Sequence, residues 1–420
     1  MTLSQIIFIL TLVVTIGIFS YSILRLVRFF KLTKKYKISH WGKRMVIMIK
    51  VAFGQSKIFR FPFAGSMHAI VFWGFMIILF GSLEMVIDGV FNLHKSLSVL
   101  GVFYKAVMAM GDVFAFLIAV AVIIFILRRI FHAVKRFDGS EMNEKKHADA
   151  LIALSLILIL MISLMGMNMM QTIRSENKMY PVSNMLASIF PMCPCKAEFW
   201  YHVFWWTHIE LIFLFANILP YSKHFHIFMS IPNVLLSRLE PLGKLNTMES
   251  ITKELQLMMN PDTTENTTPL RFGVKDVEDV TWKTYLDSLT CTQCGRCTSV
   301  CPAAQTGRKL SPRKLMIDLR ARMNEKGPHL IKNKDYSDGK SYLGDCITLE
   351  EIWACTLCNA CAQECPLMIH HPQIIIDLRR YLVLEEGKAK GGLQAVFANI
   401  ENNGAPWQYS PSERLNWINT

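Results

Sequence analysis

Five segments of this chain are long and apolar enough to cross a bilayer as helices, and this feature constrains the fold more than any other. A helix needs about twenty apolar residues to span the hydrocarbon core. The segments cover roughly residues 6–24, 63–83, 106–127, 150–170 and 202–219. The first 24 residues carry no charge, and basic residues follow this stretch instead of preceding it as in a cleaved signal peptide. We therefore expect a retained transmembrane helix at the start of a five-helix bundle.

The Lys and Arg residues are concentrated in two of the loops between these segments. Eleven of them, with no acidic residue, fall between Arg25 and Arg60, and six fall between Arg128 and Asp149. Loops rich in Lys and Arg face the cytoplasm, beside anionic lipid. We therefore expect a protein of the bacterial cytoplasmic membrane with its amino terminus outside and the part after the fifth helix in the cytoplasm. The net charge of +13 then indicates contact with anionic membrane lipid. Nucleic acid is not expected as a partner, because no nucleic-acid motif accompanies the charge.

Two cysteine boxes follow the apolar half. They read "CTQCGRCTSVCP", Cys291–Pro302, and "CTLCNACAQECP", Cys355–Pro366. In this spacing three cysteines of a run hold one 4Fe–4S cluster, and the fourth reaches the cluster of the other run. Structural zinc is the alternative, but zinc favours paired Cys-x2-Cys knuckles with four ligands per ion. The first cluster is expected on Cys291, Cys294, Cys297 and Cys365, and the second on Cys355, Cys358, Cys361 and Cys301.

The sequence around the boxes repeats a helix–box–helix unit. Thr348 and Glu351 form a capping box for the helix that leads into the second box. After each box a helix begins at a proline and contains Ile-Asp-Leu-Arg, and the two helices are expected to end at Gly327 and Gly387. The long, helical stretch between the boxes predicts an all-α protein with an α-helical ferredoxin domain. The expected divisions are a membrane domain, a linker containing "NPDTTENTTP", a dicluster domain and a tail, at residues 1–228, 229–280, 281–390 and 391–420.

Several histidines lie in or beside the apolar segments, where ionisable side chains are expensive and indicate function. His68 lies in the second segment, and His208 lies 18 residues, about 27 Å of helix, before His226. This spacing is typical of ligands for b-type haems at two depths. We expect His68 to bind haem b together with His224 or His226, although a position among lipid headgroups is the alternative for those two. A second haem would use His208, for which the remaining candidates, His94 and His202, lie in or beside outer loops.

The acids Glu84, Asp112 and Glu210 lie at or inside the apolar segments and are candidates for proton transfer. The sequence assigns no role to Cys193 or Cys195. Cys346, nine residues before the second box, is expected to be a core or surface thiol and not a cluster ligand.

Four stretches together resemble the heterodisulfide reductase-like membrane iron–sulfur proteins, and among them the electron-transfer flavoprotein:menaquinone oxidoreductase type. They are "MHAIVFWGF", "YSKHFHI", "TWKTYLDSLTCTQCGRCTSVCPAAQTGRKLSPRKL" and "NIENNGAPWQYSPSERLNW". The first half is similar to the five-spanning cytochrome b gamma subunit of nitrate reductase, and the second half to the C subunit of heterodisulfide reductase. The resemblance implies a cytochrome b-like bundle with haem b, two 4Fe–4S clusters and a quinone partner. The nitrate reductase pattern has a second histidine ten residues after the first, where this chain has Ile78.

The function expected from these residues is electron transfer between a cytoplasmic redox partner and menaquinone, within an oxidoreductase. The chain contains neither a dinucleotide fingerprint nor the cysteine-rich CCG-type catalytic domain that continues the resembling fused enzymes. We therefore expect the soluble substrate to meet a separate CCG-type, heterodisulfide reductase B-like subunit or a flavoprotein donor. That subunit would dock on the tail after Gly391, with Trp407 and Trp417 as anchors. The alternatives are a quinol-oxidising subunit that feeds a heterodisulfide- or sulfite-type reductase, and an iron–sulfur redox sensor without haem.

Overall fold

A computed structural model describes residues 2–139, 141–175, 179–260, 271–413 and 415–419 of the chain. Throughout this described part the regular structure is helical, and the β-structure consists of two isolated bridges. This confirms the all-α prediction. Most of the predicted linker centre "NPDTTENTTP", residues 260–269, lies outside the described residues.

The chain forms two compact units that interleave along the sequence. The first unit comprises Met1–Phe29, Ile38–Ser237 and Leu289–Gly295. The second comprises Phe30–Lys37, Arg238–Ser288 and Arg296–Thr420. Each unit therefore takes a short segment from the part of the sequence that mainly builds the other.

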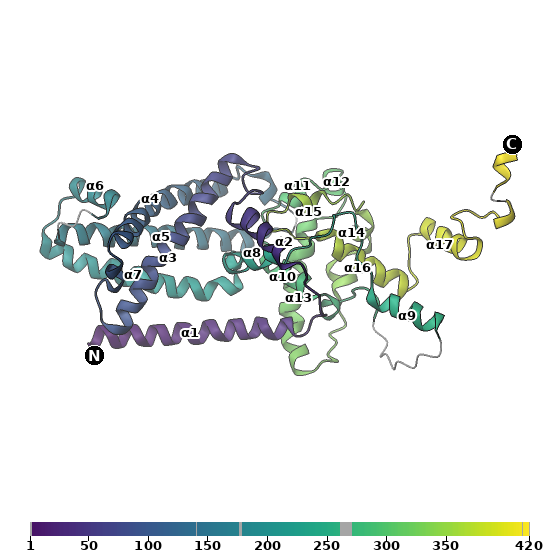
Figure 1. The fold of residues 1–420 in the computed structure, drawn as a ribbon, viewed down its shortest axis with the longest axis horizontal. Helices are drawn as coiled ribbons and strands as arrows, with labels where there is room; N and C mark the ends of the chain where they lie inside the picture. The colour runs from purple at the N-terminus through teal and green to yellow at the C-terminus, as the bar shows by residue number, and fades with distance from the viewer. Residues whose placement is uncertain (1, 140, 176–178, 261–270, 414, 420) are drawn as a thin grey trace. The chain divides into compact units, whose positions relative to one another are not determined.

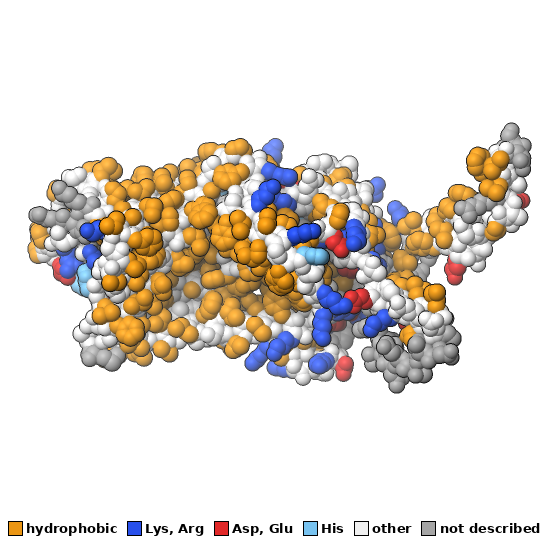
Figure 2. Space-filling view, in the orientation of Figure 1, with side chains coloured by type: hydrophobic (Ala, Val, Ile, Leu, Met, Phe, Trp, Pro, Cys, Tyr) orange, Lys and Arg blue, Asp and Glu red, His pale blue; other side chains and the backbone are white. Residues whose placement is uncertain are grey.

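Five long helices that run side by side make up most of the first unit (Figure 1). They are α1 (Leu3–Phe30), α3 (Pro62–Phe91), α4 (Val102–Ile130), α5 (Glu144–Ser175) and α7 (Pro194–Ile218). All five are long and apolar enough to cross a membrane, which confirms the five predicted spans. Each helix exceeds its predicted span because the apolar run marks only the hydrocarbon-facing part, whereas the helix continues through its polar ends. Apolar side chains cover the visible face of these helices (Figure 2).

Glycines allow the long helices to approach one another closely. A Cβ atom on Gly89 of α3 would lie 2.5 Å from the ring of Phe8 in α1, and one on Gly166 of α5 would lie 2.8 Å from Phe204 in α7. Membrane helices pack through such small residues because lipid supplies no hydrophobic drive between them. The result is a core between α4 and α5 and a second one between α1, α3 and α7, the latter containing Phe8, Met85, Ile209 and Phe213.

Short helices connect the long ones at the end of the bundle that carries His68. α2 (Trp41–Met48) and the π-helical turn η1 (Ile49–Phe53) both pack against α8 (His226–Leu235). The buried guanidinium of Arg44 in α2 donates hydrogen bonds to the carbonyls of Leu235 and Ser237 at the carboxyl end of α8. A cation at this position satisfies helix carbonyls that have no partner within the helix.

The second unit is a cluster of shorter helices joined by loops. Its principal helices are α10 (Trp282–Thr290), α13 (Pro312–Lys332), α14 (Leu349–Ala354) and α16 (His371–Leu384). The interleaved segment Phe30–Lys37 is attached to the rest of this unit through an isolated parallel bridge. There the backbone N–H of Lys34 donates to the Val280 carbonyl, and the carbonyl of Lys34 accepts from the Trp282 amide. The predicted capping box of Thr348 and Glu351 at the start of α14 is confirmed.

The prediction that the helix after the first box ends at Gly327 is wrong, because α13 continues through Gly327 and Pro328 to Lys332. Side chains on both sides of this pair are anchored. Lys326 donates to Asp276 at 2.8 Å, and Leu330 is buried. Pro328 removes only one backbone hydrogen-bond donor from the helix. The tertiary contacts of Lys326 and Leu330 therefore outweigh the tendency of Gly327 and Pro328 to end it. The helix after the second box ends at Leu384, and Gly387 follows it with φ of 60°.

Candidate functional site

The two cysteine boxes have the same local structure. In each box the first two cysteines lie in a non-helical loop, the third lies in a short helix, and the fourth follows that helix. The short helices are α11 (Arg296–Ser299) and α15 (Ala360–Glu364), and they pack against each other. The repeat that the sequence shows is therefore also a repeat of backbone conformation.

Left-handed residues alternate through both loops at matching positions. The φ angles are 59° at Gln293 and 74° at Gly295 in the first box, and 56° at Leu357 and 63° at Asn359 in the second. Successive residues of this kind turn their amide groups toward an anionic ligand. The amide of Leu357 lies 3.4 Å from the Cys355 sulfur, to which it donates a hydrogen bond. Left-handed backbone at residues other than glycine is costly and concentrates at functional sites, and it occurs here next to the cysteines.

The structure brings Cys301 into electrostatic contact with cysteines of the second box. Cys355 and Cys361 each interact with both Cys301 and Cys358. Burial raises the pKa of the Cys355 thiol and raises that of Cys361 to about 12. Without a metal, burial keeps such a thiol protonated. A metal replaces the proton when it binds, because cysteine binds metals as the thiolate. These donors fit the cluster expected on Cys301, Cys355, Cys358 and Cys361, although that ligand set remains a prediction.

The other predicted ligand set draws on both units. Cys291 and Cys294 lie in the segment Leu289–Gly295 of the first unit, whereas Cys297 and Cys365 lie in the second. Its assembly therefore remains a prediction. Among the described residues, no group of three or more His, Cys, Asp or Glu side chains is arranged to hold a single metal ion.

Each box is contacted by an arginine that the sequence analysis did not identify. In the first unit, Arg136 Nε donates to the carbonyl of Cys294 at 3.2 Å, and its guanidinium lies 5.4 Å from the centre of the Phe61 ring. In the second unit, Arg379 Nη2 donates to the carbonyl of Cys355 at 2.6 Å and stacks over Trp353 at 4.8 Å. Arg379 belongs to the repeated Ile-Asp-Leu-Arg motif, and this repeat could have identified it from the sequence. For Arg136 the sequence offers only its position in a basic loop.

His68 is oriented by a side chain from the turn that precedes its helix. Its Nδ1 lies 3.1 Å from Oε1 of Gln55, a buried residue in left-handed conformation. The amide oxygen only accepts, so Nδ1 carries the proton and Nε2 keeps the lone pair that a metal requires. Buried or metal-binding histidines are commonly oriented in this way.

His224 and His226 lie next to each other, with ring centres 6.0 Å apart, where α7 gives way to α8. The Nδ1 of His226 donates to the carbonyl of Lys223, and that of His224 lies 3.0 Å from the hydroxyl of Ser222. Burial lowers the pKa of His224 to about 3 and also lowers that of His226, so both rings are neutral. Neutral imidazoles with an oriented Nδ1 are suitable metal ligands.

The remaining histidines are in different environments. His94 and His202 are exposed, and His202 contacts Glu198 at 3.0 Å. His208 is buried. Its Nδ1 lies 3.0 Å from both the Leu160 carbonyl and the Ser163 hydroxyl, whereas its Nε2 has no hydrogen-bond partner in the described part of the chain.

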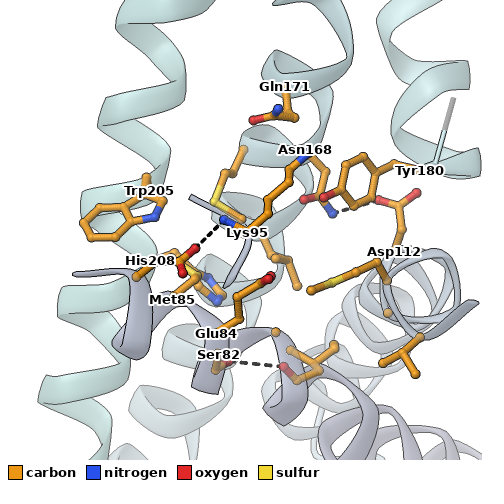
Figure 3. Close-up of a pocket in the computed structure, with 18 of the residues that line it drawn as sticks. Ser82, Glu84, Met85, Lys95, Asp112, Asn168, Gln171, Tyr180, Trp205 and His208 are labelled. Atoms are coloured by element: carbon orange, nitrogen blue, oxygen red, sulfur yellow. Dashed lines mark hydrogen bonds between the residues drawn. The ribbon is translucent and has the colours of Figure 1, made fainter. Parts of the chain in front are cut away.

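His208 lines a cavity of about 90 Å³ inside the bundle of the first unit. The wall is formed by α3, α4, α5, α7 and the outer loop. Met85, Trp205, Glu84 and His208 lie on one side of the view in Figure 3, and Asn168, Tyr180 and Asp112 lie on the other. Two glycines, Gly81 and Gly111, also line it, and a Cβ atom on Gly111 would meet no atom within 4 Å. The sequence shows these residues only as scattered polar positions in apolar helices.

Two of the acids considered for proton transfer have backbone partners. Asp112 accepts hydrogen bonds from Asn168 and from the amides of Val182 and Ser183, which open helix α6 (Pro181–Ile189). The carboxylate thus stabilises the amino terminus of a connecting helix. Glu84 accepts from the Leu97 amide and from the Tyr104 hydroxyl, each at 3.0 Å. The Oε1 atom of Glu210 is buried and has no partner among the described residues.

Comparisons with known proteins agree with the cysteine boxes and the membrane helices. Residues 287–369 match the family described as 4Fe-4S dicluster domain. The chain is 31% identical over 399 residues to the EtfAB:quinone oxidoreductase of Syntrophomonas wolfei, covering 87% of this chain and 52% of that protein. It is 29% identical over 449 residues to the probable iron-sulfur-binding oxidoreductase FadF of Bacillus subtilis, covering 99% and 60%. No solved structure matches the chain.

A probable membrane-anchored ferredoxin of Chromohalobacter salexigens is 37% identical over 160 residues, covering 34% of this chain and 24% of that protein. Subunits D and C of heterodisulfide reductases from Methanosarcina are more distant homologues. The chain spans about half the length of the first two curated relatives. It is therefore a membrane-anchored homologue of these iron–sulfur oxidoreductases, with a 4Fe-4S dicluster domain at residues 287–369.

Proposed function

We propose that this chain transfers electrons between a cytoplasmic redox partner and the menaquinone pool, through two 4Fe–4S clusters and haem b. The observation that carries the proposal is that one chain combines two cysteine boxes with five membrane helices, one of which bears the oriented imidazole of His68. Clusters and haem each supply one-electron transfer when bound. The name of the Syntrophomonas relative, EtfAB:quinone oxidoreductase, supports the quinone and a flavoprotein donor.

The haem site in this proposal uses His68 and either His224 or His226. Gln55 holds the proton of His68 at Nδ1, and the Lys223 carbonyl does the same for His226. Helix α8 begins at His226 and packs against η1, the turn that ends two residues before Gln55. The chain therefore orients both imidazoles from neighbouring segments, and Nε2 is the atom of each that would bind iron.

The soluble substrate is proposed to react on another subunit, either a CCG-type catalytic subunit or a flavoprotein. Helix α17 (Gly391–Asn403) leaves an apolar face exposed at Leu393, Phe397 and Ile400, and Trp407 and Trp417 beyond it are exposed as well. Exposed aromatic residues of this kind are typical anchors of protein interfaces. In this proposal the cluster-bearing part is cytoplasmic and the amino terminus lies outside the cytoplasmic membrane, because Lys and Arg are concentrated in the loops between α1 and α3 and between α4 and α5.

The homology to heterodisulfide reductase subunits D and C favours one second candidate function. In that case the same carriers would run in the opposite direction, and quinol oxidation would feed a cytoplasmic reductase. Direction depends on the potentials of the carriers, which the hydrogen bonds and burial around each cluster set.

A visible difference spectrum, dithionite-reduced minus oxidised, tests the proposal on the purified full-length protein. A b-type α band that responds to a menaquinol analogue is expected. His68→Ala should abolish the band without changing the iron and sulfide content of the clusters. His94→Ala, which removes an exposed histidine of the outer loop, should leave both unchanged. A wild-type protein with full clusters and no b-type band would contradict the proposal and favour the sensor alternative.

A further inference from the structure

We propose that Cys193 and Cys195, at the start of helix α7, bind one Cu(I) ion between their two sulfur atoms. The sequence assigns neither cysteine a role, and both lie outside the two cysteine boxes. The inference goes beyond the proposed electron transfer, because it uses none of the residues expected to hold the clusters or haem.

The two thiols contact each other and are open to solvent. The thiol of Cys195 donates a hydrogen bond to the sulfur of Cys193, and both cysteines are exposed and free of disulfides. Helix α7 begins at Pro194, so Cys193 is its N-cap and Cys195 its second residue. The proline ring fixes φ, and the amides of Lys196 and Ala197 each donate to the Cys193 carbonyl at 3.1 Å. The backbone therefore holds the two sulfurs together before any ligand binds.

The number and chemistry of these donors favour Cu(I) over other metal ions. Thiolates are soft ligands that select Cu(I) and Zn(II). Zinc in structural sites takes four ligands, whereas Cu(I) also binds stably between two thiolates. Among the residues that the structure describes, no group of three or more His, Cys, Asp or Glu side chains is arranged around a single ion. The pair is therefore a two-coordinate site.

The carboxylate that could complete a larger site is already occupied. Glu198 lies one helical turn after Cys195, and its side chain forms an ion pair with Arg174 and contacts Nε2 of His202 at 3.0 Å. Binding of Cu(I) would replace the two thiol protons with one ion and leave the oxidation state of copper unchanged. No oxidant or reductant is needed.

The direction of the helices places the pair on the same side as the amino terminus. Phe8 of α1 packs against Trp205 of α7 with ring centres 5.8 Å apart, and the hydroxyls of Ser22 and Tyr221 lie 2.9 Å apart. Later residues of α1 thus meet later residues of the α7 segment, so the two helices run parallel and begin at the same end. In the proposed orientation this end lies outside the membrane, and the copper would come from that side.

The test uses the purified full-length protein in lipid nanodiscs, kept reduced and free of oxygen, and Cu(I) buffered by the chromophoric chelator bathocuproine disulfonate. The wild type should bind one more equivalent of Cu(I) than a variant with both Cys193→Ser and Cys195→Ser. Either substitution alone should also remove this equivalent, because one thiolate does not hold the ion. Cys346→Ser is the matched control, since it removes a half-buried thiol of the second unit and should bind copper like the wild type.

Labelling with maleimide gives a second readout on the same samples. Cu(I) should protect both thiols of the wild type, whereas Zn(II) at the same concentration should leave them reactive. Equal copper uptake by the wild type and the double variant, at equal iron content, would overturn the assignment. Thiols that react with maleimide only after a reductant is added would also overturn it, because the pair would then be a disulfide. Neither result bears on the haem and quinone, which the visible spectrum tests separately.

Discussion

Gly295 and Asn359 occupy the same position in the two cysteine boxes, one residue after the second cysteine, and both have a left-handed backbone with φ of 74° and 63°. Glycine adopts this conformation without steric cost, and asparagine is the side-chain-bearing residue that tolerates it best. The two boxes therefore have the same backbone conformation at this position, although the residues differ.

Gly295→Ala is expected to weaken the first box, because a Cβ atom in left-handed backbone costs roughly 1–2 kcal/mol. The purified protein should contain less iron and sulfide per chain and lose cluster absorbance at a lower temperature. Asn359→Gly is the matched control. It keeps the left-handed conformation and loses only the hydrogen bond from Asn359 Nδ2 to the Leu357 carbonyl, so full iron content is expected. Equal iron content and thermal stability in Gly295→Ala would contradict this account.

Arg136→Gln is expected to lower the reduction potential of the cluster that Cys294 would hold. The guanidinium donates to the Cys294 carbonyl, and its positive charge favours the reduced, more negative state. A change on the order of 60 mV corresponds to about 1.4 kcal/mol for a one-electron couple. A redox titration followed by electron paramagnetic resonance measures it. Arg128→Gln removes a charge from helix α4 at a side chain that packs over Phe63, and both potentials should remain unchanged in that variant.

Arg322→Gln is expected to destabilise the second unit by about 3 kcal/mol, because it removes a buried cation that bridges Asp276 and Asp338 and leaves Asp276 with Lys326 as its remaining basic partner. Arg322 is 1% exposed and contacts Asp276 at 2.9 Å and Asp338 at 2.6 Å. Thermal unfolding followed by circular dichroism measures the loss. Glu325→Gln removes a partner that is 56% exposed and should change stability by less than about 1 kcal/mol.

The same cluster predicts a pH dependence of unfolding. Arg322 holds the pKa of Asp338 well below its ordinary value of 3.8. A depressed carboxyl pKa contributes stability above the unfolded-state value, and this contribution is lost as the pH falls below it. The wild-type protein should therefore lose more stability between pH 5 and about 3 than Asp338→Asn does. Parallel pH curves for the two proteins would exclude the contribution.

Removal of residues 391–420 is expected to release the proposed catalytic subunit while both clusters and the membrane helices remain. Co-purification from membranes measures the retention of the partner. Phe397→Glu on the exposed face of α17 should have the same effect with the tail present. Leu349→Glu, at a leucine of the second unit that is 45% exposed, should retain the partner. A complex that survives both changes would show that docking occurs elsewhere.

Much of the architecture is determined locally and was therefore predictable. The membrane helices follow from long apolar runs, because backbone groups in lipid must be satisfied within the helix. The capping box of Thr348 and Glu351 depends on residues three positions apart, and the first three cysteines of each box lie within seven consecutive residues. Helix α13 continues past Gly327 and Pro328, where the sequence predicts its end. It does so because Lys326 contacts Asp276, a residue distant in the sequence.

The sequence by itself thus determined the helical class, the five spans, the two cysteine boxes and the positions of histidines in or beside the apolar segments. Only the tertiary structure decided which side chains meet: Arg136 at Cys294, Gln55 at His68, and the Leu160 carbonyl at His208. The physical reason is range. Helix formation and loop conformation depend on neighbours along the chain, whereas the proton on an imidazole and a cavity between helices depend on atoms that the sequence separates by tens of residues.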